Sequence, residues 1–179
     1  SGIPLSPDQI SLYLAVSADC SISKERKAGF RHARFAVKKL RKYERLKGIL
    51  DRLGIEYYDS GLLRRGYYYL GFRVPEYIRS KELPFSWVKD ATLEQREHIL
   101  REQRYWDGNE VPNRNQLEYS TVSYHNAVVM QTIAHTAGYA STIIDKYPEY
   151  IYNGITRVSH VYKVSILFGK NSVSIQKPK

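Results

Sequence analysis

A short pattern that predicts a capped helix running into an aspartate occurs twice in this 179-residue sequence. In the first copy Ser6 is a candidate N-cap, and the following helix runs to Asp19. In the second copy Thr92 and Gln95 have the spacing of a capping box, and the helix runs to Asp107. The caps are 92 − 6 = 86 positions apart and the aspartates 107 − 19 = 88. The recurrence predicts two structural repeats.

An aspartate is an unusual residue at the C-terminal end of a helix. The helix dipole places partial negative charge there, so a carboxylate loses roughly 0.3–1 kcal/mol. Gly108 is predicted to be the left-handed residue that stops the second helix, which would make Asp107 its last or nearly last residue. A divalent cation would offset the unfavourable charge at both helix ends.

The segments after each patterned helix predict a similar order of elements in both halves. In the first half we expect a hairpin that turns at Gly29, an amphipathic helix over 39–53 ended by Gly54, and strands over 55–59 and 65–74. In the second half we expect a turn over 108–115, a strand over 116–122, a helix over 123–137 ended by Gly138, and strands over 139–144 and 158–168 joined by a loop.

These elements predict an α/β (α+β) fold of two pseudo-symmetric αββαββ repeats with antiparallel, saddle-shaped sheets. The expected organisation is a first repeat over 3–80, a connector over 81–90, a second repeat over 91–169 and a basic tail over 170–179. The two patterned helices would pair about an approximate two-fold axis. The apolar faces expected to meet are those of Ile10, Leu14 and Ala15 with Ile99, Leu100 and Gln103.

The charge of the chain favours a polyanionic partner. Its formal charge is 28 − 18 = +10, and neutralising phosphates with such a surplus releases condensed counterions. A generally basic domain without such a partner is the alternative on charge alone. The single cysteine, Cys20, excludes an internal disulfide and a cysteine-rich zinc site and fits an intracellular, reducing location. No apolar run approaches the roughly 18 residues that span a membrane, so we expect no membrane partner.

A two-fold pairing of the helices would bring Asp19 and Asp107 together. Two nearby carboxylates do not both stay charged comfortably unless a cation lies between them. Oxygen ligands favour Mg²⁺, which takes few protein carboxylates and completes its shell with water and phosphate oxygens. Such a metal can activate water and neutralise the leaving oxygen in phosphodiester hydrolysis. The residues therefore point to a magnesium-dependent nuclease.

At this point the sequence resembles the LAGLIDADG homing endonucleases in their monomeric, two-repeat form. The first signature helix resembles residues 12–20 (LYLAVSADC), and the second resembles residues 98–108 (HILREQRYWDG). Residues 119–121 (YST), 129–134 (VMQTIA) and 137–139 (AGY) are similar to the segment that follows the second signature. The resemblance covers nearly the whole chain. It departs from the family pattern at Cys20, where glycine is usual, and in the bulky, polar run from Arg101 to Trp106.

The resemblance implies a site-specific, double-strand DNA endonuclease that acts as a monomer. Asp19 and Asp107 would be catalytic and bind Mg²⁺ or Mn²⁺, with Ca²⁺ as a non-catalytic substitute, and the backbones of Cys20 and Gly108 would be further metal ligands. A basic residue on a late strand is common near the metals, and Lys163 is the candidate for orienting water or stabilising phosphate charge. Leu70 or Arg73 could be its counterpart in the first half.

Each curved sheet would lie in the major groove of double-stranded DNA with a long specific target. The residues expected to contact DNA are Arg31, Arg34, Lys38, Arg64, Arg65, Arg73, Gln116, Ser120 and Lys163. Which sheet face each occupies depends on a register that a slip of one residue would invert.

Two further functions are compatible with the same scaffold. One is an intron RNA maturase, which would need the basic surface but not both acids. The other is a catalytically inactive DNA-binding protein. Retention of both aspartates favours the nuclease, and its origin could be intron-encoded, free-standing or derived from an intein.

Overall fold

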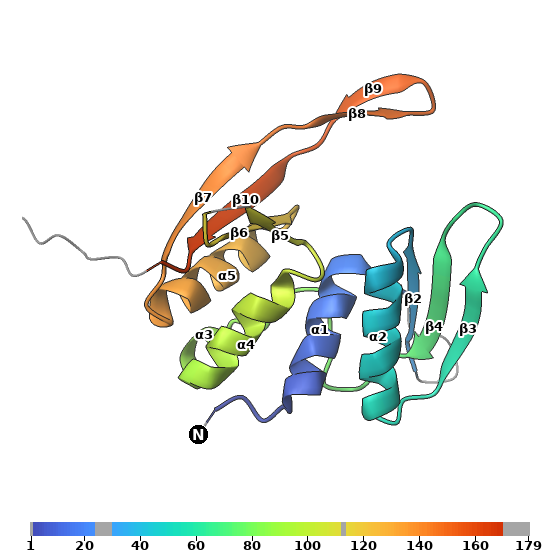
Figure 1. Cartoon of the computed structure of the whole chain (residues 1–179), viewed down its shortest axis with the longest axis horizontal. Helices are drawn as coiled ribbons and strands as arrows, with labels where there is room; N and C mark the ends of the chain where they lie inside the picture. The colour runs from blue at the N-terminus through green and yellow to red at the C-terminus, as the bar shows by residue number, and fades with distance from the viewer. Residues whose placement is uncertain (1, 24–29, 112–113, 170–179) are drawn as a thin grey trace, which may run out of the picture.

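Two four-stranded antiparallel sheets flank a central pair of helices in the computed structural model, which describes residues 2–23, 30–111 and 114–169 (Figure 1). The first sheet has the order β1-β2-β4-β3, from β1 (Cys20–Ile22), β2 (His32–Val37), β3 (Tyr57–Leu62) and β4 (Tyr68–Arg73). The second has the order β5-β6-β10-β7, from β5 (Gly108–Val111), β6 (Gln116–Thr121), β7 (Ala140–Lys146) and β10 (Val161–Leu167). The predicted α/β fold with antiparallel sheets is confirmed.

The central helices are α1 (Pro7–Asp19) and α4 (Leu93–Gln103). Both begin with a complete capping box, which Ser6 forms with Gln9 and Thr92 forms with Gln95. On either side of this pair, α2 (Leu40–Arg52) covers the first sheet and α5 (Tyr124–Thr136) covers the second (Figure 1). Each sheet therefore keeps one face that no helix of the described residues covers.

Two pairs of corresponding elements recur at the same offset in the two halves. The strands β2 and β6 begin 116 − 32 = 84 positions apart, and the helices α2 and α5 begin 124 − 40 = 84 apart. Gly54 and Gly138, which follow these helices, both have positive φ, at 64° and 90°. The boundaries at 3–80, 81–90 and 91–169 stay a prediction.

The core fills the space between the central helices and the sheets. Along β2 the inward residues Ala33, Phe35 and Val37 are buried, as the alternation of a one-sided sheet requires. The helix α1 is buried on all sides from Ile10 to Val16, which suits its place between α2 and α4. The six residues predicted for the helix pair are all buried: Ile10, Leu14, Ala15, Ile99, Leu100 and Gln103.

Two local predictions were wrong. The segment predicted as a turn over 108–115 begins with the strand β5, which pairs with β6. The connector, for which no helix or strand was predicted, contains the helix α3 (Ser86–Asp90). The predicted loop of the second half forms a hairpin of β8 (Glu149–Tyr152) and β9 (Ile155–Val158), so the last strand begins at Val161 and not at 158. The hairpin turns at Asn153-Gly154, whose positive φ angles of 51° and 75° are those of a primed turn.

Two other predictions concern segments that the structure does not describe. The hairpin turn at Gly29 and the tail over 170–179 lie outside the described residues. Within the described residues, no helix combines the length and the apolar character needed to cross a membrane.

Candidate metal and DNA site

Asp19 is the last residue of α1, where the helix passes directly into β1. Its carboxylate does not stand alone at the helix end. The ammonium of Lys42, from the first turn of α2, lies 2.5 Å from Asp19 Oδ2. Lys42 is only 8% exposed, so this ion pair is largely shielded from water. The ammonium supplies the positive charge that a carboxylate at a helix C-terminus needs.

Asp107 is presented by a different local structure. The helix α4 ends at Gln103, so Asp107 lies four positions beyond it in a turn and not at the helix end. Gly108 was predicted to be left-handed, and this is wrong: it is the first residue of β5, and its φ is not positive. The two-residue difference between the offsets of the caps (86) and of the acids (88) corresponds to this extra turn.

Glycine at position 108 is required by a close approach of the turn to the helix end. A Cβ there would lie 2.6 Å from the carbonyl oxygen of Gln103 and 2.8 Å from the Cα of Arg104. Gly108→Ala is therefore expected to lower the free energy of unfolding by about 1–3 kcal/mol, because backbone must move. Gly48→Ala in α2 is the control, since its Cβ would meet only the end of Arg52, at 3.4 Å. Denaturant unfolding measures the free energy of unfolding of both variants and of the wild type. If Gly108→Ala were as stable as the wild type, the close packing of Gly108 on the end of α4 would be contradicted.

The environment of Asp107 disfavours its negative charge. Burial, followed by the charge of Asp19, raises the pKa of this carboxyl from 3.8 to about 6. The cations Lys42 and Lys81 act in the opposite direction. Among the described residues no ion pair involves Asp107. The structure thus brings the two predicted acids within electrostatic reach and leaves Asp107 without a direct counter-charge.

This raised pKa predicts that Asp107 destabilises the folded chain at neutral pH. The folded state binds the proton more tightly than the unfolded state, so the contribution of Asp107 to stability is greatest below pH 3.8 and is lost as the pH rises through about 6. The loss is at most about 3 kcal/mol, at 1.36 kcal/mol per pKa unit. Asp107→Asn should therefore be more stable than the wild type at pH 7.5 but not at pH 4. Urea unfolding at both values measures this, and a pH-independent difference would contradict it.

The sequence analysis missed two candidate site residues, Lys42 and Lys81. Only Lys42 had a recognisable signal in the sequence. Lys42 lies on the buried stripe of its helix with Leu46 and Ile49, so a lysine occupied an apolar position. The 84-residue offset places Asn126 as its counterpart, and that side chain is also buried. Lys81, whose charge lowers the pKa of both Asp107 and Cys20, lies in the connector and carried no periodic signal.

The donor set suits a hard cation that keeps part of its water shell. No group of three or more His, Cys, Asp or Glu side chains with metal-binding geometry occurs in the described residues. Two carboxylates fit Mg²⁺, which relies on water and phosphate oxygens for the rest of its shell. The thiol of Cys20 is buried, which raises its pKa, so that side chain is not a thiolate ligand.

On the first sheet the register decides which predicted DNA contacts face outward. Arg34 pairs with Gly71 and is exposed on the face opposite α2, and Arg73 pairs with His32 on the same face. This face has a hollow of about 430 Å³ lined by Ser23, Phe30, His32, Ala33, Arg34, Tyr58, Tyr69 and Gly71. Arg34 and Arg73 are therefore placed to meet a ligand that covers the sheet.

Four other first-half residues lie outside this strand register. Arg64 and Arg65 are exposed at the turn between β3 and β4, and the ammonium of Lys38 lies 5.2 Å from the ring centre of Tyr67. Arg31 donates hydrogen bonds to the carbonyl oxygens of Ile78 and Arg79. Its guanidinium is thus engaged with the backbone that leads into the connector.

On the second sheet Gln116, Ser120 and Lys163 share the face opposite α5. Lys163 pairs with Ser120 across β10 and β6, while the neighbouring Val164 is buried toward α5. The ammonium of Lys163 lies 2.6 Å from Glu118 Oε2 and is not among the charges that act on Asp107. The cations that lower the pKa of Asp107 are Lys42 and Lys81. The catalytic role of Lys163 stays a prediction.

Comparison with solved structures identifies the fold. The homing endonuclease I-DmoI in complex with DNA and Mn has a TM-score of 0.57 and 12% identity, with 90% of each chain covered. Full-length DUF199/WhiA from Thermatoga maritima has a TM-score of 0.61 and 15% identity over 92% of this chain. The N-terminal LAGLIDADG domain of DUF199/WhiA has a TM-score of 0.57 and 14% identity over 92% of this chain. The resemblance to LAGLIDADG proteins inferred from the signatures is confirmed at the level of the fold.

The same comparisons do not choose between the two kinds of neighbour. The chain spans 53% of full-length WhiA, about half its length, and 90% of I-DmoI. No protein-family model and no curated protein sequence matches the chain. The shared fold therefore does not decide the function of this chain.

Proposed function

We propose that this chain is a site-specific double-strand DNA endonuclease that hydrolyses phosphodiester bonds with a divalent cation held by Asp19 and Asp107. The observation that carries the proposal is that the paired helices α1 and α4 each lead into an aspartate, Asp19 directly before β1 and Asp107 directly before β5. A fold shared with I-DmoI, whose structure contains DNA and Mn, supports it. The charge of +10 favours the same polyanionic substrate.

The proposed cation is Mg²⁺ or Mn²⁺, with Ca²⁺ as a non-catalytic substitute. Structures of I-DmoI contain Mn, Mg or Ca together with DNA, which supports this choice of ions. Bound to both carboxylates, the ion would lower the pKa of a bound water and neutralise the leaving oxygen. The backbones of Cys20 and Gly108 are the proposed additional ligands.

The side chains of the site and of the two sheets have different proposed roles in binding the cation and the DNA. Asp19 and Asp107 supply negative oxygen ligands for the cation. The ammonium of Lys42 can leave Asp19 when a cation arrives and neutralise charge on a phosphate instead. The outward faces of the two sheets, which carry Arg34, Arg73 and Lys163, bind and align the duplex.

A second function is favoured by one specific contact. If the ammonium of Lys42 stays on Asp19, the acid is already neutralised and a metal gains little there. The chain would then be a DNA-binding protein that does not cut. The fold is compatible with this function, and the state of Lys42 distinguishes the two.

Selection from a randomised duplex pool tests the proposal. The chain is incubated with the pool in Ca²⁺, bound duplexes are retained, and Mg²⁺ is then added. Discrete breaks in both strands of one recovered sequence are the expected result, and sequencing their ends reveals the target. Recovery of one sequence that stays intact in Mg²⁺ and in Mn²⁺ would contradict cleavage and favour the DNA-binding protein.

A further inference from the structure

The position of Asp107 depends on a turn and not on a helix. After α4 ends at Gln103, the amide of Tyr105 donates to the carbonyl oxygen of Glu102 and the amide of Trp106 to that of Gln103, each at 3.1 Å. Asp19, by contrast, is itself helical. A four-residue turn has few bonds of its own, so the carboxylate of Asp107 needs external support to hold one position.

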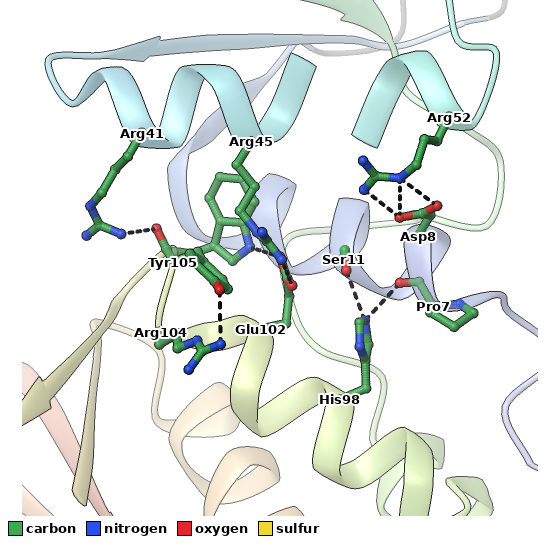
Figure 2. A network of polar contacts seen from close by, with 11 residues as sticks. Pro7, Asp8, Ser11, Arg41, Arg45, Arg52, His98, Glu102, Arg104 and Tyr105 are labelled. Atoms are coloured by element: carbon green, nitrogen blue, oxygen red, sulfur yellow. Dashed lines mark hydrogen bonds and ion pairs between the residues drawn. The ribbon is translucent and has the colours of Figure 1, made fainter. Parts of the chain in front are cut away.

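That support comes from a buried carboxylate at the end of α4. Glu102 is 2% exposed, and both of its oxygens are occupied. Arg45 Nε donates to Oε1 at 2.8 Å and Arg45 Nη2 donates to Oε2, while the indole Nε1 of Trp106 donates to Oε1 at 3.0 Å (Figure 2). A single carboxylate thus ties the residue before Asp107 to a guanidinium from α2. Arg45, Glu102 and Trp106 are called the inter-half clamp below.

The clamp is braced by further groups of the first half. The guanidinium of Arg45 lies 3.6 Å from the ring centre of Tyr105, and Arg41 donates to the Tyr105 carbonyl oxygen at 3.4 Å (Figure 2). The ring of Trp106 meets Phe35 edge-on with 6.3 Å between centroids. The turn that presents the second-half acid is therefore held by α2 and β2, which belong to the first half.

The first half has no such device where an equivalent would stand. The offsets of 86 and 88 place Val16 and Leu14 opposite Glu102, and both are buried apolar residues of α1. A buried ion pair seldom stabilises a fold more than apolar residues of the same size do. The buried pair occurs beside Asp107, the acid that lies off its helix, and has no equivalent beside Asp19 among the described residues. This difference indicates a role in placing Asp107.

We propose that Arg45, Glu102 and Trp106 are positioning residues that fix the Asp107 carboxylate relative to Asp19, a role that rests on the proposed metal-dependent cleavage. They act through the turn and touch neither metal nor DNA. Partners that orient a ligand from behind are typically worth about 10- to 100-fold in metal affinity. The clamp therefore determines how precisely the Asp107 carboxylate is placed relative to Asp19, and so how tightly the two acids bind a cation.

The test uses a double substitution that keeps the packing. Arg45→Met with Glu102→Met replaces the buried pair by apolar side chains of similar length, a change that folds tend to tolerate. Glu102→Gln is the conservative variant, because its amide oxygen can still accept from Trp106. Arg52→Met is the matched control, since Arg52 also lies on α2 and forms a two-pronged pair, with Asp8, at the opposite end of α1 (Figure 2).

Hydrogen exchange tests the clamp without any metal. In the double variant the amides of Trp106 and Ser120, which donates to the Asp107 carbonyl oxygen at 3.2 Å, should exchange about tenfold faster or more, while amides of α1 keep their rates. Glu102→Gln should show a smaller change, and Arg52→Met none at these two amides. Unchanged exchange in a folded double variant would overturn the proposal.

Titration with Mn²⁺ alone, followed by electron paramagnetic resonance, then separates positioning from general loosening. On the Asp19→Asn background, where Asp107 is the remaining acid, the double substitution should weaken Mn²⁺ binding about tenfold or more. On the Asp107→Asn background it should have no effect. Equal losses on both backgrounds would overturn the proposal. If the wild type binds no Mn²⁺, the proposed metal-dependent function is contradicted. The role of the clamp is still tested in that case, because the exchange rates show whether it holds the turn.

Discussion

Asp107→Asn and Asp19→Asn are each expected to abolish cleavage of the selected duplex while leaving its binding in place. Both variants keep the shape of the side chain and remove the negative charge that holds the cation. Since the metal both activates water and neutralises the leaving oxygen, losing it should lower the cleavage rate by about 100-fold or more, the scale of removing one main electrostatic contribution. Strand breaks on a denaturing gel and binding in Ca²⁺ measure the two effects separately.

The matched control is another aspartate at the end of a helix. Asp90 is the last residue of α3 and is exposed, so Asp90→Asn removes the same charge from the same kind of position without touching the site. Its cleavage rate should equal that of the wild type. If Asp107→Asn or Asp19→Asn cut as fast as Asp90→Asn does, the acid pair is not catalytic.

Lys42→Met is expected to produce the largest loss of stability in the metal-free chain. The substitution removes the partner of the shielded Asp19 carboxylate and leaves two interacting acids without their closest counter-charge. Breaking a buried pair from one side costs about 3–5 kcal/mol. Mn²⁺ should restore part of this loss, because a ligand that binds only the folded state stabilises it according to its affinity.

Denaturant unfolding of the wild type and of Lys42→Met, each with and without Mn²⁺, measures how far Mn²⁺ replaces the ammonium of Lys42. The proposed nuclease predicts that Mn²⁺ stabilises the variant more than the wild type, since Lys42 no longer competes for Asp19. Lys47→Met is the control. Lys47 lies on the same helix as Lys42 and also pairs with an aspartate, Asp59, but at a more exposed position. An equal Mn²⁺ effect in all three proteins would show that the metal does not bind where Lys42 does.

Much of the fold could be predicted because local chemistry and tertiary structure agree there. Ser6 and Thr92 cap their helices in the structure, and Gly54 and Gly138 stop theirs in the left-handed conformation. The hairpin at Asn153-Gly154 carried a valid turn signal that the nearby Pro148 obscured. These are positions where a few neighbouring residues decide the conformation.

The details of the site could not be predicted because they depend on contacts between the halves. Nothing near Gly108 in the sequence tells a helix stop from a glycine that lets β5 pass close to the end of α4. Lys42 meets Asp19 only after α2 has packed beside α1, and Arg45 meets Glu102 only across the interface of the two halves. Residue type indicated the acids, whereas their counter-charges required the three-dimensional structure.

The most direct test of the two-acid site is the location of Mn²⁺ in a crystal of the chain with its selected duplex. The proposed function predicts an anomalous peak within coordination distance of Asp19 and Asp107, with the ammonium of Lys42 withdrawn from Asp19, and no peak in Asp107→Asn. A duplex-bound structure in which Lys42 still contacts Asp19 and no Mn²⁺ lies at either acid would contradict the metal site. The chain would then be a DNA-binding protein on a nuclease fold.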